Sequence, residues 1–194
     1  ESLIPFDAAD TLLDHQLAAT LEPTKIRIVV CAVPRARVRE RLTLLENAGI
    51  DPDELVPGPA ALGGLVTLIP TLASNGPHLI VNVGARRTDV AIVRQGKLEL
   101  ARTISAGADD VREAGFQEGP FGSGAERLSR ELKQTLASHR MHGVDEPVSI
   151  RMAGDVDGGA PIADWLAHAL GRTPVLLELP EAPAGGTLYR ILFL

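Results

Sequence analysis

The segment Val81-Asn-Val-Gly-Ala-Arg-Arg-Thr-Asp89 decides the fold. Alternating apolar residues on either side of it predict two antiparallel strands, over 79–83 and 88–94, joined by a tight turn at 84–87. Gly84 lets the backbone turn closely around an oxyanion, and the Thr88 hydroxyl and free N–H groups would line the same turn. These are the features of a phosphate-binding hairpin, although a plain hairpin whose glycine supplies positive φ fits the same residues.

The segments that follow extend this hairpin into an α/β domain. Gln95-Gly96 predicts a two-residue turn into a third strand over 98–104. Further along the chain we expect helices over 108–114 and 124–140, a strand over 148–153, a helix over 161–170 and a strand over 173–179. Three antiparallel strands leading into helices and further strands are the order of an RNase H-like fold, the unit from which actin-like proteins are built.

Residues 1–57 predict a small subdomain that precedes this lobe. Residues 8–18 fit either a short helix followed by a strand or a single helix, and the β-branched run over 25–33 is typical of a buried strand. A helix is expected over 35–48, with Gly49 in its αL cap. Residues 58–77 predict a connector with a short helix over 60–72, and residues 78–194 predict the second lobe. The apolar stretch 187–194 predicts a strand that pairs with a lobe or with a second copy in a homodimer.

Composition and charge exclude several classes of protein. The net charge of −6 and the pI near 5.4 argue against a nucleic-acid binder, which normally presents a basic face. The one cysteine, Cys31, lies in an apolar run, so we expect a buried small side chain and a reducing compartment. No signal peptide opens the sequence, and the uncharged run over 55–77 is broken by prolines and glycines. The chain as written is therefore expected to be soluble.

Two more segments carry candidate site residues. In the segment Ile150–Asp155, a strand leads into Gly154, close to a following helix N-terminus where an adenosine or phosphate could rest, and an ordinary loop is the alternative. Glu126 lies near the start of the long helix. In chain order, the three segments resemble the phosphate-2 hairpin, the nucleotide-contacting helix and the adenosine loop of actin-like ATPases.

Together these motifs resemble the actin-like (ASKHA) cytoplasmic proteins of bacterial envelope machines, namely type II secretion system protein L (GspL) and the type IV pilus assembly protein PilM. The Arg86-Arg-Thr88 and Arg102-Thr-Ile-Ser105 segments are closer to protein L. The resemblance is carried by the following segments: Ile4-Pro-Phe-Asp7, Leu13-Asp14, Val30-Cys-Ala-Val-Pro-Arg35, Ala48-Gly-Ile-Asp-Pro52, Val81–Val90, Ala101–Gly107 and Ala153-Gly154.

The resemblance implies a scaffold on the cytoplasmic face of the inner membrane. A protein L-like chain would recruit the secretion ATPase and bind platform proteins, and would meet the membrane only through parts outside this chain. The alternative is a PilM-like, ATP-binding protein that holds a short N-terminal peptide of its pilus membrane partner. Contact surfaces are expected on the first subdomain and on the edge strand of the hairpin, because an unpaired edge accepts a strand.

Departures from the family pattern predict that the nucleotide cleft is degenerate. Asn82 stands where the family has aspartate, and an amide does not supply the charge that holds magnesium. Ser129 replaces a lysine, and Asp155 replaces a glycine of the adenosine loop. No Asp-x-Gly hairpin precedes Ile4, so we expect the chain to begin inside the first lobe.

The sequence therefore predicts a non-enzymatic protein without a metal or a bound cofactor. A weak actin-like ATPase with ATP and magnesium is the alternative. The residues predicted to form the remnant of the nucleotide site are Asn82, Gly84, Thr88, Glu126 and Gly154.

Other candidates for chemistry are isolated. His139 and His142 are spaced to share a metal, but no third ligand is evident, and the favoured interpretation is a pair of exposed histidines. Trp165 shares an apolar stripe with Ile162 and Leu166, which predicts core packing.

Overall fold

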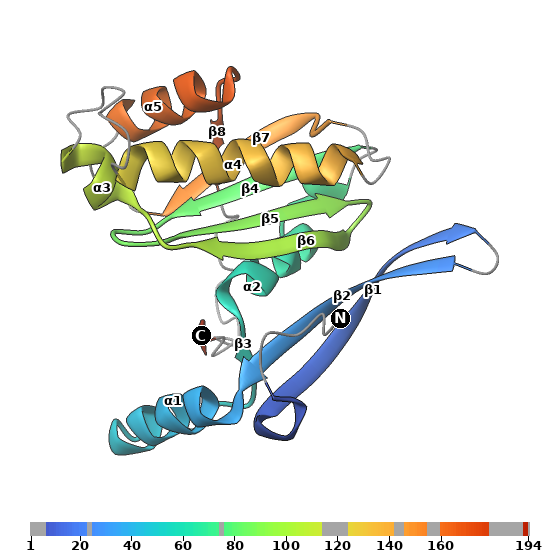
Figure 1. Ribbon diagram of the computed structural model, residues 1–194, viewed down its shortest axis with the longest axis vertical. Coiled ribbons are helices and arrows are strands. Elements are labelled where there is room, and N and C mark those ends of the chain that lie inside the picture. The colour runs from blue at the N-terminus through green and yellow to red at the C-terminus, as the bar shows by residue number, and fades with distance from the viewer. Residues whose placement is uncertain are drawn as a thin grey trace, which may run out of the picture.

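A five-stranded mixed sheet forms the centre of the molecule (Figure 1). The computed structural model describes residues 7–22, 25–73, 76–113, 124–141, 146–154, 160–178 and 192–193. The strands lie in the order β6-β5-β4-β7-β8, with the first three antiparallel and the last two parallel to β4. Their bounds are β4 (Pro77–Val83), β5 (Thr88–Arg94), β6 (Lys97–Ile104), β7 (Ser149–Gly154) and β8 (Val175–Leu176).

The meander over β4, β5 and β6 confirms the sequence prediction. Val83 pairs with Thr88 across the first turn. At the second turn, Gln95 and Gly96 both have positive φ, 47° and 78°. These angles are those of a type I′ turn, whose twist matches that of the flanking strands.

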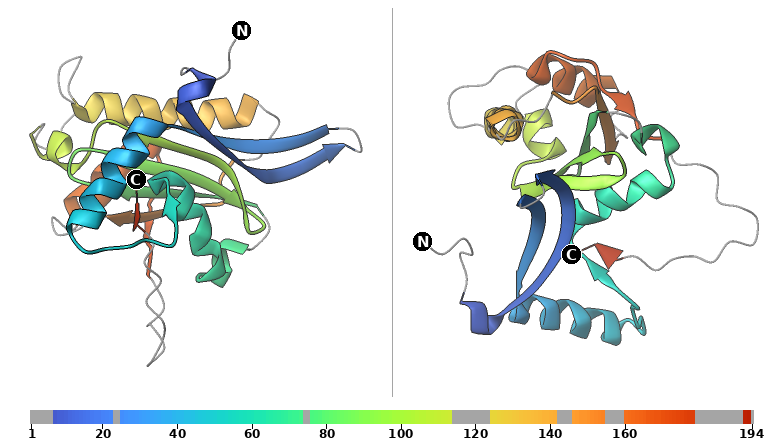
Figure 2. Two further views of the ribbon diagram at one scale, coloured as in Figure 1. Left: turned by 90° about the horizontal axis from the view of Figure 1, so that it is seen from below. Right: turned by 90° about the vertical axis from the view of Figure 1, so that its right-hand side faces the viewer.

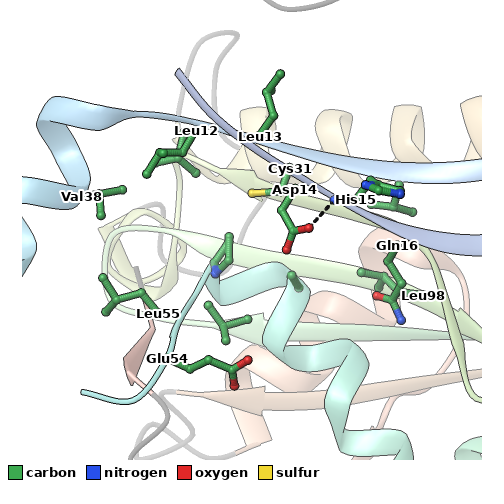
Figure 3. A pocket seen from close by; sticks show the side chains of 15 residues that line it. Leu12, Leu13, Asp14, His15, Gln16, Cys31, Val38, Glu54, Leu55 and Leu98 are labelled. Carbon is green, nitrogen blue, oxygen red and sulfur yellow. Dashed lines mark hydrogen bonds between the residues drawn. The ribbon is translucent and has the colours of Figure 1, made fainter. Parts of the chain in front are cut away.

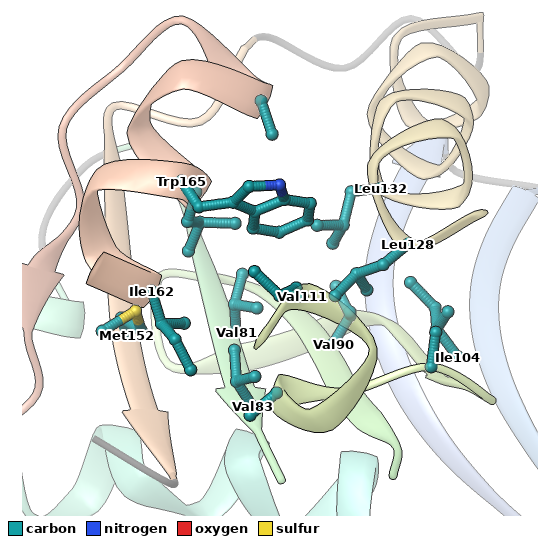
Figure 4. Packing of buried hydrophobic residues seen from close by; sticks show 14 of the residues in the cluster. Val81, Val83, Val90, Ile104, Val111, Leu128, Leu132, Met152, Ile162 and Trp165 are labelled. Atoms are coloured by element: carbon teal, nitrogen blue, oxygen red, sulfur yellow. The ribbon is translucent and has the colours of Figure 1, made fainter. Parts of the chain in front are cut away.

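Three helices cover one face of the sheet: α3 (Ala108–Glu113), α4 (Gly124–Met141) and α5 (Ala160–Leu170). Alternate residues of β4 and β5 point toward them, so that Val81 and Val90 are fully buried. Trp165 is 8% exposed and packs in the same cluster, as its apolar stripe predicts (Figure 4). This cluster is the larger of the two hydrophobic cores.

The opposite face of the sheet is covered by the connector. Its α2 helix (Gly58–Gly64) packs on β5 and β6, where Leu62 and Val66 join Ile80 in a second hydrophobic cluster. The single helix predicted over 60–72 is wrong. The chain instead forms α2 and two 3₁₀ turns, Leu65–Thr67 and Pro70–Ala73, because Gly63, Gly64 and Pro70 interrupt a regular helix.

Residues 8–47 form a two-stranded sheet and one helix, and the two strands lie beside β6 (Figure 2). A 3₁₀ turn, Ala8–Asp10, leads into β1 (Thr11–Glu22), which agrees with the first of the two alternatives for this region. Strand β1 pairs with β2 (Lys25–Pro34), and α1 (Arg35–Asn47) ends where Gly49 has the expected positive φ of 70°.

The prediction that the run over 25–33 is a buried strand is wrong. Ile28 and Val30 are 45% and 50% exposed, since β2 belongs to a two-stranded hairpin with one open face. Their cross-strand partners, Leu17 and His15, share that face and are also exposed. The β-branched composition thus reflects strand propensity and not burial.

The C-terminal region contributes two short strands. Strand β8 has only two residues where a strand over 173–179 was expected, and β9 (Leu192–Phe193) pairs in parallel with β3 (Leu55–Val56). The described part of the predicted C-terminal strand, residues 192–193, therefore pairs with β3 of this chain. None of the described helices combines the length and apolar character needed to span a bilayer.

Candidate functional site

The ends of β4 and β7 bring three of the predicted nucleotide-site residues together. Asn82 pairs with Ala153, and Val83 pairs with Gly154, so Gly84 and Gly154 lie at the same edge of the sheet. Gly154 has φ of 106°, and a Cβ atom there would lie 2.1 Å from the Val83 carbonyl oxygen. Glycine is therefore required at this edge by the close approach of two backbones.

The turn at 84–87 is docked on the start of α3. The carbonyl oxygens of Gly84 and Ala85 accept hydrogen bonds from the amides of Ala108 and Asp109, each at 2.9 Å. A Cβ atom on Gly107 would lie 2.3 Å from the Gly84 oxygen, which shows how tightly the two segments meet. Amides at a helix start are those that bind a phosphate in other sites, and here the turn itself occupies them.

Thr88 and Glu126 lie on the helix-covered side of this edge. The Thr88 hydroxyl is fully buried and donates to the Ala106 carbonyl oxygen at 2.9 Å, so it is engaged inside the hairpin. Glu126 is half-buried in the first turn of α4, which packs against α3. Asn82 lies on the opposite face of the sheet, with Ile80 and the connector. The loop after Gly154, including Asp155, lies outside the described residues, and Ser129 is half-buried on α4.

The sequence did not predict that the Asp89 side chain is buried. It pairs directly with Asn82 across β4 and β5 and is 8% exposed. Its Oδ1 atom accepts a hydrogen bond from the Thr103 hydroxyl at 2.6 Å, and its Oδ2 atom would lie 2.7 Å from a Cβ atom on Gly58. This carboxylate is packed under the start of α2. Within the described ranges, no three His, Cys, Asp or Glu side chains are placed to hold a metal ion.

A groove of about 420 Å³ lies between the β1–β2 hairpin and the connector (Figure 3). We call it the hairpin groove. One wall comes from the inner face of the hairpin, and the other comes from β3 and the first turn of α2. Its lining residues are Leu12–Gln16, Val29, Cys31, Val33, Val38, Glu54–Pro57, Ala60 and Leu98.

The hairpin groove is largely apolar but acidic at its mouth. The Asp14 and Glu54 side chains are exposed and project into the groove from opposite walls. Cys31 is half-buried in the groove wall, which corrects the expectation of a fully buried thiol. Burial and the neighbouring Asp14 carboxylate raise the pKa of this thiol, so it stays protonated and poorly nucleophilic near neutral pH.

A second cavity of about 440 Å³ shares the Cys31, Val33 and Pro57 wall. Its outer rim on α1 carries Arg37, Glu40 and Arg41. Arg37 and Glu40 form an ion pair of 3.5 Å between strongly exposed side chains. The α1 rim is thus of mixed charge, unlike the mouth of the hairpin groove.

His139 belongs to a buried polar cluster between β6 and α4. It is 5% exposed, and its Nε2 atom lies 2.9 Å from Glu99 Oε2. Arg94 Nε lies 3.1 Å from the other oxygen of Glu99. The expectation that His139 is solvent-exposed is therefore wrong. His142 lies outside the described residues, so the proposed histidine pair is not visible as a site.

Comparison with solved structures shows which fold these elements form. The structure matches the PilM–PilN type IV pilus biogenesis complex with a TM-score of 0.68 and 22% sequence identity, over 90% of this chain and 58% of that chain. The chain therefore spans less than two thirds of that protein's length. An ethanolamine utilization protein, EutJ, from Carboxydothermus hydrogenoformans matches with a TM-score of 0.48 and 16% identity, over 70% of this chain and 54% of that chain.

A Bacteroides thetaiotaomicron protein described as having an actin-like ATPase fold matches with a TM-score of 0.44 and 8% identity, over 88% of this chain and 55% of that chain. No protein-family model and no curated protein sequence matches the chain. The motif order in the sequence predicted an RNase H-like lobe of actin-like type. The observed sheet and the match to the PilM–PilN structure agree with it, and the chain has an α/β, actin-like fold.

Proposed function

We propose that this chain is a scaffold domain of a bacterial inner-membrane assembly platform, and that it holds an extended segment of a membrane partner in the hairpin groove. The observation that carries the proposal is the groove itself, an open apolar channel of about 420 Å³. The fold likeness to PilM, solved with PilN, supports the same role. In this proposal the chain works at the cytoplasmic face of the membrane.

The walls of the groove suit an extended segment. Strands β1 and β2 pair only with each other among the described strands, so each has a backbone edge open to hydrogen bonding. An added strand gains affinity from such an edge and specificity from side-chain pockets on alternate residues. Leu12, Val33 and Leu55 supply apolar contacts on both sides of the channel.

Two machines fit this proposal. The Arg86-Arg87-Thr88 segment favours a protein L-like member of a type II secretion platform, which would also recruit the secretion ATPase. The fold likeness supports the PilM-like alternative, in which the partner is a pilus membrane protein. Binding assays with the N-terminal domain of the cognate secretion ATPase and with the tails of pilus membrane proteins distinguish the two.

The partner proposal predicts a groove-dependent complex. Fluorescently labelled peptides that copy the cytoplasmic N-terminal tails of the inner-membrane proteins encoded beside this chain's gene are the probes. We expect one tail to bind, as measured by fluorescence anisotropy. Leu55→Arg is expected to weaken that binding at least about tenfold, because it places a charge against the apolar wall.

Leu68→Arg is the matched control for this experiment. Leu68 is 54% exposed and lies outside the groove, so the same substitution there is expected to leave the affinity unchanged. The proposal would be contradicted if no tail bound, or if both arginine variants weakened binding equally.

We also expect that the chain does not hydrolyse ATP. The amides at the start of α3 and the Thr88 hydroxyl already have protein partners, and Asn82 lacks the charge that holds magnesium. Radiolabelled ATP with magnesium is therefore expected to yield phosphate no faster than a protein-free blank. Asn82→Asp alone is expected to stay inactive, because the turn remains docked on α3. Robust magnesium-dependent turnover by the wild-type chain would favour the ATPase alternative.

A further inference from the structure

The mouth of the hairpin groove carries two carboxylates on facing walls. Asp14 projects from β1, and Glu54 projects from the residue that precedes β3 (Figure 3). The walls behind them are mainly apolar, with Leu12, Val29 and Leu55 among the lining residues. Two like charges of this kind, placed across an apolar channel, favour a cation between them.

Among the described residues, none supplies a lysine or arginine side chain at this position. No lysine or arginine lines the groove, and among the described residues neither Asp14 nor Glu54 forms an ion pair. Asp14 Oδ1 accepts a hydrogen bond from the backbone amide of His15 at 2.7 Å. That bond fixes the orientation of the carboxylate but does not neutralise it.

Other polar groups that line the groove do not offset these charges. His15 and Gln16 are exposed, and His15 belongs to the outer face of the hairpin, where it pairs with Val30. The Asp14 charge also acts on Cys31 of the neighbouring strand β2. Burial is the larger cause of the raised pKa of the Cys31 thiol, and the Asp14 charge is the second. The groove therefore combines an apolar surface with a negative potential.

We propose that the hairpin groove selects an extended segment in which a lysine or arginine, flanked by apolar residues, lies between Asp14 and Glu54. This inference rests on the proposed function and names the chemistry of the partner. The apolar neighbours supply affinity, and the two carboxylates supply selectivity. A glutamate at the central position would meet two like charges and be rejected, and an uncharged residue would leave both carboxylates without a partner.

A displayed library of random twelve-residue peptides tests this inference without knowledge of the natural partner. It is panned against the wild-type chain and against the double variant Asp14→Asn/Glu54→Gln, which keeps both side-chain shapes. The matched control is Glu40→Gln/Glu46→Gln. It also removes two negative charges, but from exposed positions on α1 that lie outside the groove. Thermal unfolding of each variant confirms that it is folded.

We expect the wild type and the α1 control to enrich one basic residue flanked by apolar residues, and the groove double variant to lose that basic preference. A labelled peptide of the selected sequence is then compared with its Lys→Gln or Arg→Gln version by anisotropy. The substitution in the peptide is expected to weaken binding to the wild type about tenfold and binding to the double variant less than about twofold.

The possible failures of the two proposals are distinguishable. Selected peptides that lose binding to Leu55→Arg but show no basic preference would overturn the charge selection and leave the docking role standing. Peptides that bind Leu55→Arg as well as the wild type, or the recovery of no binder, would overturn the docking role together with this inference. A preference for a basic residue that survives in the groove double variant would also overturn the charge selection.

Discussion

Gly154→Ala is expected to lower the free energy of unfolding by about 3 kcal/mol, which is large for a single added methyl group. The residue has φ of 106°, a region that side-chain-bearing residues rarely occupy. The new Cβ atom would also lie 2.1 Å from the Val83 carbonyl oxygen, so β4 and β7 could not keep their pairing. Urea unfolding followed by circular dichroism measures the loss.

Gly49→Ala separates the two causes of this effect. Gly49 also has positive φ, 70°, but a Cβ atom there would meet nothing within 4 Å. Only conformational strain remains, and we expect Gly49→Ala to lower the free energy of unfolding by about 1 kcal/mol. Equal losses for the two variants would show that the contact with β4 adds nothing, and that Gly154 is not required by the sheet.

Glu99→Ala is expected to lower the free energy of unfolding by about 3 kcal/mol at pH 7, because it removes the buried carboxylate that contacts both Arg94 and His139. The Glu99 side chain is 4% exposed and contacts both groups. Burial alone would raise the pKa of Glu99. The hydrogen bond from His139 and the charges of Arg94, His139 and Arg27 outweigh burial and hold that pKa below its ordinary range.

The pH dependence of this variant follows from the direction of that shift. The folded chain keeps the Glu99 carboxylate ionised at lower pH than the unfolded chain does, where its pKa is about 4.3. The stabilisation is therefore complete above that pH and is lost as pH falls through the folded pKa. The difference between wild type and Glu99→Ala should shrink at acidic pH. Urea unfolding over pH 3–7 tests this, and a constant difference would contradict it.

Glu40→Ala provides the matched control. Glu40 pairs with Arg37 on the surface of α1, where both side chains are more than half exposed. Such pairs contribute at most about 1 kcal/mol, so this variant should unfold close to the wild type at every pH.

Local patterns in the sequence predicted strands β4, β5 and β6 well. Strict alternation between apolar and polar neighbours, together with Gln95-Gly96, identified β5 and β6 to within a residue. Gly49 was also correct as a helix end, since it has positive φ. These features depend on neighbouring residues alone, and the sequence contains that information.

Features that depend on tertiary contacts were harder to predict. The run over 25–33 has the composition of a buried strand, but its burial depends on whether a second layer covers the hairpin, and no local pattern reports that. His139 has polar neighbours in sequence, and only the fold brings it against Glu99, 40 residues away. Asp89 was visible in the decisive segment, but its packing against Gly58 depends on how the connector folds back.

The structure favours a different candidate site from the one that the sequence predicted, and the reason is again tertiary contacts. Sequence motifs pointed to the turn at 84–87, since glycine and threonine there match a phosphate cradle. The structure places the carbonyl oxygens of Gly84 and Ala85 in hydrogen bonds with the start of α3, and the Thr88 hydroxyl in a hydrogen bond with Ala106. The hairpin groove is formed by residues from β1, β2, β3 and α2 that are far apart in the sequence, and no single motif marks it.

Amide hydrogen exchange measured by mass spectrometry tests most directly which of these two places is the working site. The chain is compared alone, with the partner tail that it binds, and with magnesium and ATP. We predict that the tail slows exchange over 11–18, 28–33 and 54–60, and that the nucleotide changes nothing over 82–88 or 106–110. Slower exchange over 82–88 and 106–110 with magnesium and ATP, with no effect of any tail on the hairpin groove, would contradict the account.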